Sequence, residues 1–283
     1  MSDIVIHALA SAAYAGLAWH FWNTRWRSDS QDARAGLAGW ERSALAAALA
    51  LHGVILAQLL FLPEAPRFGF AFALSSMLWV AVLFYWVESF FVNLDSILPG
   101  ALGLTALCVP LTAWFPGRVP PTTSFEFRVH VSLVILAYGV LTIALLHAIL
   151  MALVERLLHR VRQTAVAGAS GGVLSGPLAS LPPLLTLERM LFRLIALAFV
   201  LLTLTLVTGM SLSETLFGQA LRFNHETVFA IVSWLVFGLL LVGRRYQGWR
   251  GRTAMRWVLA GYLCVILAGV GTRFVLEVIL GRG

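Results

Sequence analysis

The histidines are the side chains of this sequence best suited to chemistry. The stretch "SFEFRVHVSLVILAYGV" (124–140) places His130 where a polar segment leads into a long apolar run. A second polar segment, "FGQALRFNHET" (217–227), places His225 directly before another apolar run. Imidazole nitrogen suits transition metals and above all haem iron. We therefore interpret these two histidines as a candidate ligand pair that meets at one level.

Two imidazoles that face each other across a flat cofactor predict a non-covalent haem site. No CxxC or CxxCH motif is present, and Cys108 and Cys264 lie far apart inside apolar runs, so we expect neither covalent haem attachment nor a thiol redox site. Zinc is disfavoured because its ligands would need shorter spacing, and the sequence has no HxxxH motif or Cys/His cluster.

The residues around the two histidines fit the same cofactor. A guanidinium can bind a haem propionate in a bidentate manner, and aromatic rings can line the macrocycle. The candidate cations are Arg128, Arg222 and Arg273, and the candidate aromatic walls are Phe125, Phe127, Phe217 and Phe223. The alternative for His130 is that it lies at the start of its helix and stays in water.

The composition predicts a membrane protein. The chain has 283 residues, of which 60% are hydrophobic and 12% charged, and its mean hydropathy is +0.87. A helix that crosses a bilayer needs about 20 mostly apolar residues. Eight such windows are present, near 4–22, 44–62, 69–87, 97–114, 129–151, 190–209, 227–243 and 257–280. We predict an all-α, polytopic integral membrane protein with eight transmembrane helices.

The arginines predict how these helices are oriented. The 20 basic residues are all Arg, and they gather in the segments after the first, fifth and seventh windows. Cytoplasmic loops are the basic ones, so both termini are expected on the outer, periplasmic side. The charge is therefore a topology signal, and no nucleic-acid partner is expected. Residues 163–183, rich in Gly, Ala, Ser and Pro, are expected to form a flexible cytoplasmic linker within a single membrane domain.

Two external segments are long enough to build a site. Residues 116–128 precede the fifth window, and residues 210–227 connect the sixth and seventh. The tandem prolines at 120 and 121 disfavour helix, so the next helix is expected to start near Thr123 or Ser124 as its N-cap. Buried His52 and His147 are candidates for an inner pair, with hydrogen bonding to neighbouring helices as the alternative.

The segment 217–227 resembles the external tryptophan-rich loop, of the form WGxxWxWDPKET, of the cytochrome c assembly proteins, CcsA and CcmC among them. Phe217 and Gly218 correspond to WG, Leu221 and Phe223 to the later tryptophans, and Asn224 to the Asp. The segments "SWLVF", "GRRYQGWRGR" and "GVGTRF" are also similar to the end of that domain, and the shorter HemX-like or YpjD-like branch is the most similar.

This resemblance implies a multi-pass protein of the bacterial inner membrane that handles haem in cytochrome c assembly. It implies His130 as an external ligand, and apocytochrome c or proteins of haem synthesis as partners. Near the end of the last window, where the family has its second external histidine, this sequence has Glu277, so His225 would be the second ligand.

A second hypothesis is a scaffold or regulator without haem, which recruits a soluble partner through its Arg-rich cytoplasmic loops. A permease is disfavoured because no internal repeat is present. We expect no enzymatic activity, since the sequence has no serine nucleophile beside a base and no phosphate-binding glycine loop.

Overall fold

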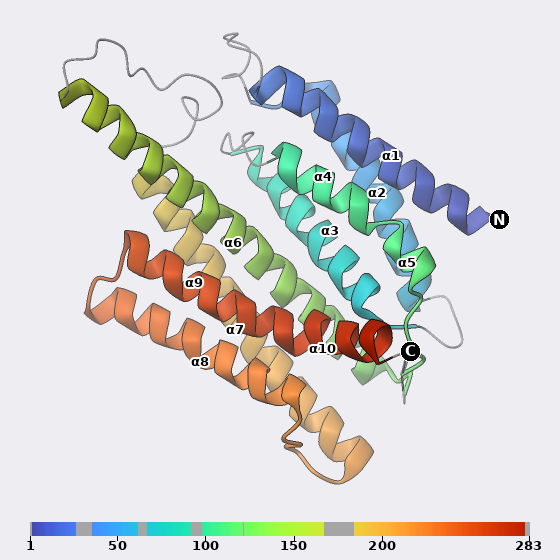
Figure 1. Cartoon of the computed structure of the whole chain (residues 1–283). Helices are drawn as coiled ribbons and strands as arrows, with labels where there is room; N and C mark the ends of the chain where they lie inside the picture. The colour runs from blue at the N-terminus through green and yellow to red at the C-terminus, as the bar shows by residue number, and fades with distance from the viewer. Residues whose placement is uncertain are drawn as a thin grey trace.

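The computed structural model describes residues 2–26, 36–61, 67–91, 98–120, 122–166 and 184–280, and the regular elements in these ranges are all helices. The α-helices are α1 (Ser2–Phe21), α2 (Gly39–Phe61), α3 (Phe70–Glu88), α4 (Leu98–Cys108), α5 (Leu111–Trp114), α6 (Phe125–Val166), α7 (Leu184–Phe217), α8 (His225–Tyr246), α9 (Gly251–Ile266) and α10 (Thr272–Phe274). Three π-helical turns, η1 (Trp22–Trp26), η3 (Leu267–Gly271) and η4 (Val275–Ile279), extend α1 and join or follow α9 and α10. Figure 1 shows the long helices side by side in an elongated bundle.

The all-α, multi-pass membrane class is confirmed. Seven helices of the described residues are long and apolar enough to cross a bilayer: Ile4–Arg25, Gly39–Phe61, Phe70–Glu88, Phe125–Arg156, Leu184–Phe217, His225–Tyr246 and Gly251–Ile279. The predicted window 97–114 corresponds to a shorter apolar helix, Leu98–Trp114, which divides into α4 and α5.

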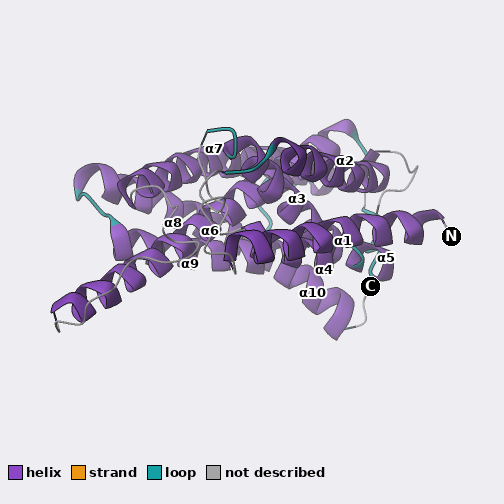
Figure 2. Cartoon of the chain, turned by 90° about the horizontal axis from the view of Figure 1, so that it is seen from above, coloured by secondary structure: helices purple, strands orange, loops and turns teal. Residues whose placement is uncertain are grey.

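The helix pair α4–α5 nevertheless returns the chain along the length of α3. Phe68, just before α3, and Arg118, just after α5, form an antiparallel bridge: the Phe68 amide donates to the Arg118 carbonyl at 2.8 Å, and the Arg118 amide donates to the Phe68 carbonyl at 3.0 Å. Figures 1 and 2 show both chain termini at this same end of the bundle. We call it the terminal end, and the opposite end, where α6 finishes and α7 starts, the linker end.

The helix boundaries differ in part from the predicted ones. The predicted start of α6 is confirmed, because the Ser124 hydroxyl accepts a hydrogen bond from the Phe127 amide at 3.3 Å. The predicted loop 210–227 was wrong in its first half, since α7 continues to Phe217 and only residues 218–224 are non-helical. Residues 163–166 of the predicted linker belong to α6, and 167–183 lie outside the described residues.

The central element of the bundle is α6, which packs against α3, α7 and α9. Small residues allow these close approaches: a Cβ atom at Gly139 would overlap Val80 of α3, and one at Gly269 would come within 2.6 Å of Tyr138. Small residues at helix contacts are typical of membrane bundles, where packing replaces the hydrophobic driving force. Because α6 has a neighbour on several sides, its successive side chains face different helices.

Candidate functional site

His130 lies in the second turn of α6 and faces α7. Its Nδ1 atom is 2.9 Å from the Thr208 hydroxyl oxygen, and the ring is half-buried beside Gly209. A side chain at Gly209 would crowd the imidazole, because a Cβ atom there would lie 3.1 Å from Cε1. The interface between α6 and α7 therefore fixes the ring in place.

The hydrogen bonds of Thr208 bear on which nitrogen of His130 carries the proton. A hydroxyl has one hydrogen to donate, and besides His130 Nδ1 the Thr208 oxygen lies 2.8 Å from the Leu204 carbonyl and 3.2 Å from the Thr205 carbonyl of its own helix. When the hydrogen goes to one of these carbonyls, Thr208 accepts from Nδ1, and Nε2 keeps its lone pair. Nε2 is not among the fully buried, unpartnered atoms of the described residues. A neutral imidazole held in this way is what a metal ligand requires.

His225 is the exposed first residue of α8. The helix start is fixed by Asn224, whose side-chain oxygen accepts from the Thr227 amide at 2.8 Å. Two residues away, Phe223 is 82% exposed. No hydrogen bond or ring contact within the described ranges joins His225 to His130, so their action as a ligand pair stays a prediction.

Two of the other predicted site residues do meet. The guanidinium carbon of Arg222 lies 4.2 Å from the centroid of the Phe217 ring, which is 50% exposed. This contact joins the end of α7 to the segment before α8, and it leaves the edges of the guanidinium available to an anion.

The remaining predicted cations lie in other parts of the terminal end. Arg128 donates from Nη1 to the carbonyl of Phe61, at the end of α2, at 3.2 Å. Arg273 donates to the carbonyl of Phe68 at 3.4 Å. Successive helical residues are about 100° apart, so Arg128 and His130 project from nearly opposite sides of α6.

Glu277, at the position of the missing family histidine, has a structural partner. Its carboxylate accepts from the Phe70 amide at 3.4 Å, at the start of α3. Gly69 leaves the space for it, since a Cβ atom there would lie 2.7 Å from a carboxylate oxygen. The side chain therefore ties the last helix to the first turn of α3.

His52 and His147 are fully buried and have different neighbours. His52 is 2.9 Å from the Ser75 hydroxyl and meets the Tyr14 ring edge-on at 5.6 Å. His147 bonds the Ile143 carbonyl of its own helix at 2.9 Å and lies 3.6 Å from a carboxylate oxygen of Glu88. The approach of Glu88 from α3 was not predicted from the sequence, because their positions in the chain carry no pairing signal.

The linker end holds ion pairs and exposed arginines. Glu188, at the start of α7, pairs with Arg244 at the end of α8, and Glu155 of α6 accepts from Arg252 of α9 at 2.9 Å. Six further arginines of this end are exposed within the described residues: Arg156, Arg189, Arg193, Arg245, Arg250 and Arg256. No group of three or more His, Cys, Asp or Glu side chains that could hold a metal ion occurs within the described residues.

Comparison with known proteins gives matches over most of the chain. The family model described as "Cytochrome C assembly protein" matches residues 41–280. The chain is 32% identical over 151 residues to the inner membrane protein YpjD of Escherichia coli, a match that covers 53% of this chain and 52% of YpjD. It is 30% identical over 165 residues to the cytochrome c biogenesis protein CcsA of Prochlorococcus marinus, covering 55% of this chain and 53% of that protein.

A longer match joins the chain to the cytochrome c biogenesis protein CcsA of Microcystis aeruginosa, with 26% identity over 229 residues, 65% of this chain and 66% of that one. The chain spans about half the length of the first curated relatives it matches.

Proposed function

The chain belongs to the cytochrome c assembly protein family, in its YpjD-like branch, and on that premise we propose that it binds and hands on haem in cytochrome c assembly. His130 and His225 are the two histidines that would hold the haem iron. Arg222 and Phe217 lie in the segment that leads to His225, where a cation for a propionate and an aromatic wall are needed, and exposed Phe223 can cover the macrocycle. In this role the protein binds and transfers a cofactor and catalyses no reaction.

The observation that carries this proposal is the hydrogen bond that holds the His130 ring. Nδ1 lies 2.9 Å from the Thr208 hydroxyl, and donation from Nδ1 to this oxygen would leave Nε2 with its lone pair. Bound haem would supply iron that accepts this lone pair, and the porphyrin would then be held at the terminal end. A ring whose Nε2 was buried against packed side chains could not bind iron through that nitrogen.

The proposed topology has eight crossings of the bacterial inner membrane, with the terminal end outside. The return of the chain by α4–α5 and the six exposed arginines of the linker end support it. Single cysteines in place of Glu214 and Gln247, both exposed, test this orientation in a variant whose Cys108 and Cys264 are replaced by Ser. In intact spheroplasts a membrane-impermeant maleimide should label the cysteine at 214 and leave the one at 247 unlabelled. The reverse pattern would overturn the orientation.

The haem proposal is tested by the visible absorption of the purified protein in detergent. A Soret band, either co-purified or formed on titration with hemin, should be present in the wild type and lost in His130→Ala. His159→Ala is the matched control, since His159 is an exposed histidine near the other end of the same helix. A colourless wild type that takes up no hemin would refute haem binding.

That colourless outcome would favour the second candidate, a scaffold that recruits a soluble partner at the cytoplasmic face. The exposed arginines of the linker end support it, because an acidic partner surface would be attracted to them. Apocytochrome c and other assembly or haem-synthesis proteins are the partners that the first proposal implies.

A further inference from the structure

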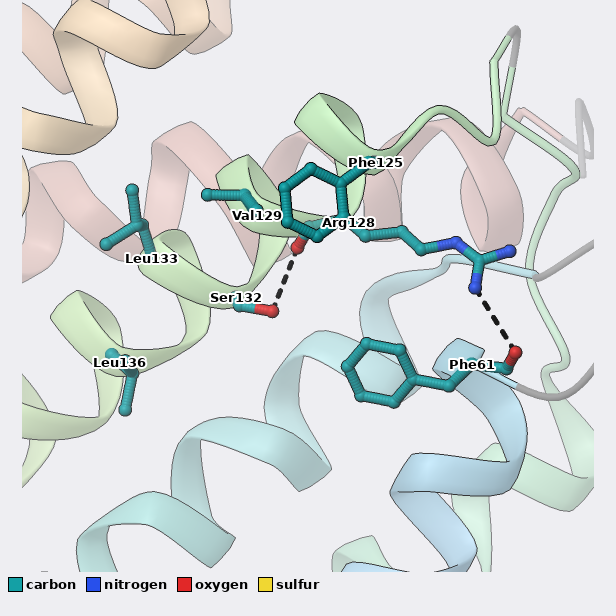
Figure 3. Close-up of a pocket in the computed structure, with 7 residues that line it drawn as sticks. All are labelled: Phe61, Phe125, Arg128, Val129, Ser132, Leu133 and Leu136. Atoms are coloured by element: carbon teal, nitrogen blue, oxygen red, sulfur yellow. Dashed lines mark hydrogen bonds between the residues drawn. The ribbon is translucent and has the colours of Figure 1, made fainter.

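A groove on the surface of α6 is separate from the His130 site. It has a volume of about 320 Å³ and is lined by Phe61, Phe125, Arg128, Val129, Ser132, Leu133 and Leu136 (Figure 3). The Ser132 hydroxyl donates to the Arg128 carbonyl at 2.8 Å, so its hydrogen is already used. The groove therefore has an apolar lining and one cation.

Arg128 is held at the edge of this groove. Its Nη1 donates to the Phe61 carbonyl, in the last turn of α2, where helical carbonyls lack partners in their own helix. Figure 3 shows the side chain extended from α6 toward α2, with its guanidinium beyond the Phe61 ring. Nε is buried and has no hydrogen-bond partner within the described residues. Apart from the bond to Phe61, the Nη1 and Nη2 hydrogens make no hydrogen bond to the part of the chain that the structure describes, so they are the donors that can meet an anion.

The groove lies within the part of α6 that crosses the membrane. The candidate span starts at Phe125, and the lining residues run from there to Leu136, about 16 Å along the helix. Phe61 is 52% exposed and Phe125 is 77% exposed, so the walls of the groove face the bilayer. A cation within one turn of the end of a span lies at the level of lipid headgroups.

The geometry places His130, the proposed ligand of the haem iron, outside this groove. Arg128 and His130 project from nearly opposite sides of α6, the first toward α2 and the second toward α7. The volume is also at the small end of the range of ligand sites, about 300 to 1,000 Å³. It suits one hydrocarbon chain better than a macrocycle.

We propose that this groove binds a net-anionic phospholipid, with one acyl chain along Val129, Leu133 and Leu136 and the phosphate on the free N–H groups of Arg128. The charge of Arg128 selects the anionic headgroup, and the apolar lining selects the acyl chain. Arg128 would thereby serve the lipid site, whereas the haem proposal depends on His130 and the segment before α8.

The test is native mass spectrometry of the detergent-purified protein with phosphatidylglycerol and with phosphatidylcholine of the same acyl chains. Phosphatidylglycerol should bind more tightly, and Arg128→Gln should weaken it about tenfold, as expected for a lost hydrogen bond to a charged group. Arg67→Gln is the matched control, because Arg67 is exposed at the same end of the bundle and does not line the groove. Leu133→Trp, which fills the groove, should weaken binding of both lipids.

Several results would overturn this proposal. The first is equal binding of phosphatidylglycerol and phosphatidylcholine. The second is an Arg128→Gln variant that binds phosphatidylglycerol as tightly as Arg67→Gln does. The third is glycerol phosphate, which has no acyl chain, binding as tightly as phosphatidylglycerol. Displacement of the lipid by hemin in a manner that depends on Arg128 would also overturn it, since the groove would then belong to the haem site. A hemin titration that fails altogether refutes the proposed function and leaves the lipid result intact.

Discussion

Replacing Thr208 by Val tests the hydrogen bond on which the haem proposal depends. Valine keeps the shape of threonine and removes the oxygen that is hydrogen-bonded to His130 Nδ1 at 2.9 Å. The ring then loses the partner that fixes its orientation. Loss of such a partner behind a metal ligand typically weakens metal binding about 10- to 100-fold. That range equals about 1.4 to 2.8 kcal/mol, somewhat more than one neutral hydrogen bond contributes.

The assay is a hemin titration followed by the Soret absorbance in one detergent. The dissociation constant should rise by that factor in Thr208→Val, and Thr208→Ser, which keeps the acceptor, should stay close to the wild type. Thr215→Val is the matched control: Thr215 is exposed on the same helix, and its hydroxyl donates to the Ser211 carbonyl of that helix at 3.0 Å. Thermal unfolding of each variant checks that the bundle is intact.

One pattern of results would refute the role of Thr208 and still leave His130 as a haem ligand. If His130→Ala abolishes hemin binding while Thr208→Val matches Thr215→Val, the histidine is a ligand but its tautomer is set by something else. If neither change affects binding, His130 is not the ligand, and the proposed site is wrong.

Three further predictions concern stability, each measured as the change in thermal unfolding in detergent. Glu41→Gln should destabilise the protein by about 1.5 to 3 kcal/mol, because it replaces the buried carboxylate that accepts from Arg25 at 2.8 Å and from the Ala38 amide at 2.7 Å by a neutral amide; an unchanged midpoint would show that this carboxylate contributes little. Gly139→Ala should cost about 1 to 3 kcal/mol by overpacking against α3, whereas Gly16→Ala, with no atom within 4 Å of the new methyl, should cost nothing; equal effects would contradict the packing argument. Arg252→Ala should cost at most about 1 kcal/mol, because its side chain is 66% exposed and its ion pair is screened by water; a larger loss would mean that the linker end is held by this pair.

The fold class could be predicted from the sequence because the hydrophobic signal is local. A run of about 20 apolar residues must form a helix in lipid, since no other single segment satisfies its own backbone hydrogen bonds. The start of α6 was predicted for a similar reason, because Ser124 caps the helix that follows it. The end of α7 was not predicted: residues 210–217 are polar enough to read as a loop, yet they continue the helix beyond the apolar run.

The candidate site also has a part that the sequence predicts and a part that depends on the tertiary structure. The sequence by itself determined that His130 and His225 lie near the starts of two helices, because hydropathy acts along the chain, and its arginines predict that these starts share one side of the membrane. It also determined the family, since that rests on residue patterns. Only the tertiary structure decided that Thr208 holds the His130 ring and that Arg128 faces α2. The side of α6 from which a residue projects changes by about 100° at each step, and what it meets there depends on helices that lie far away in the sequence.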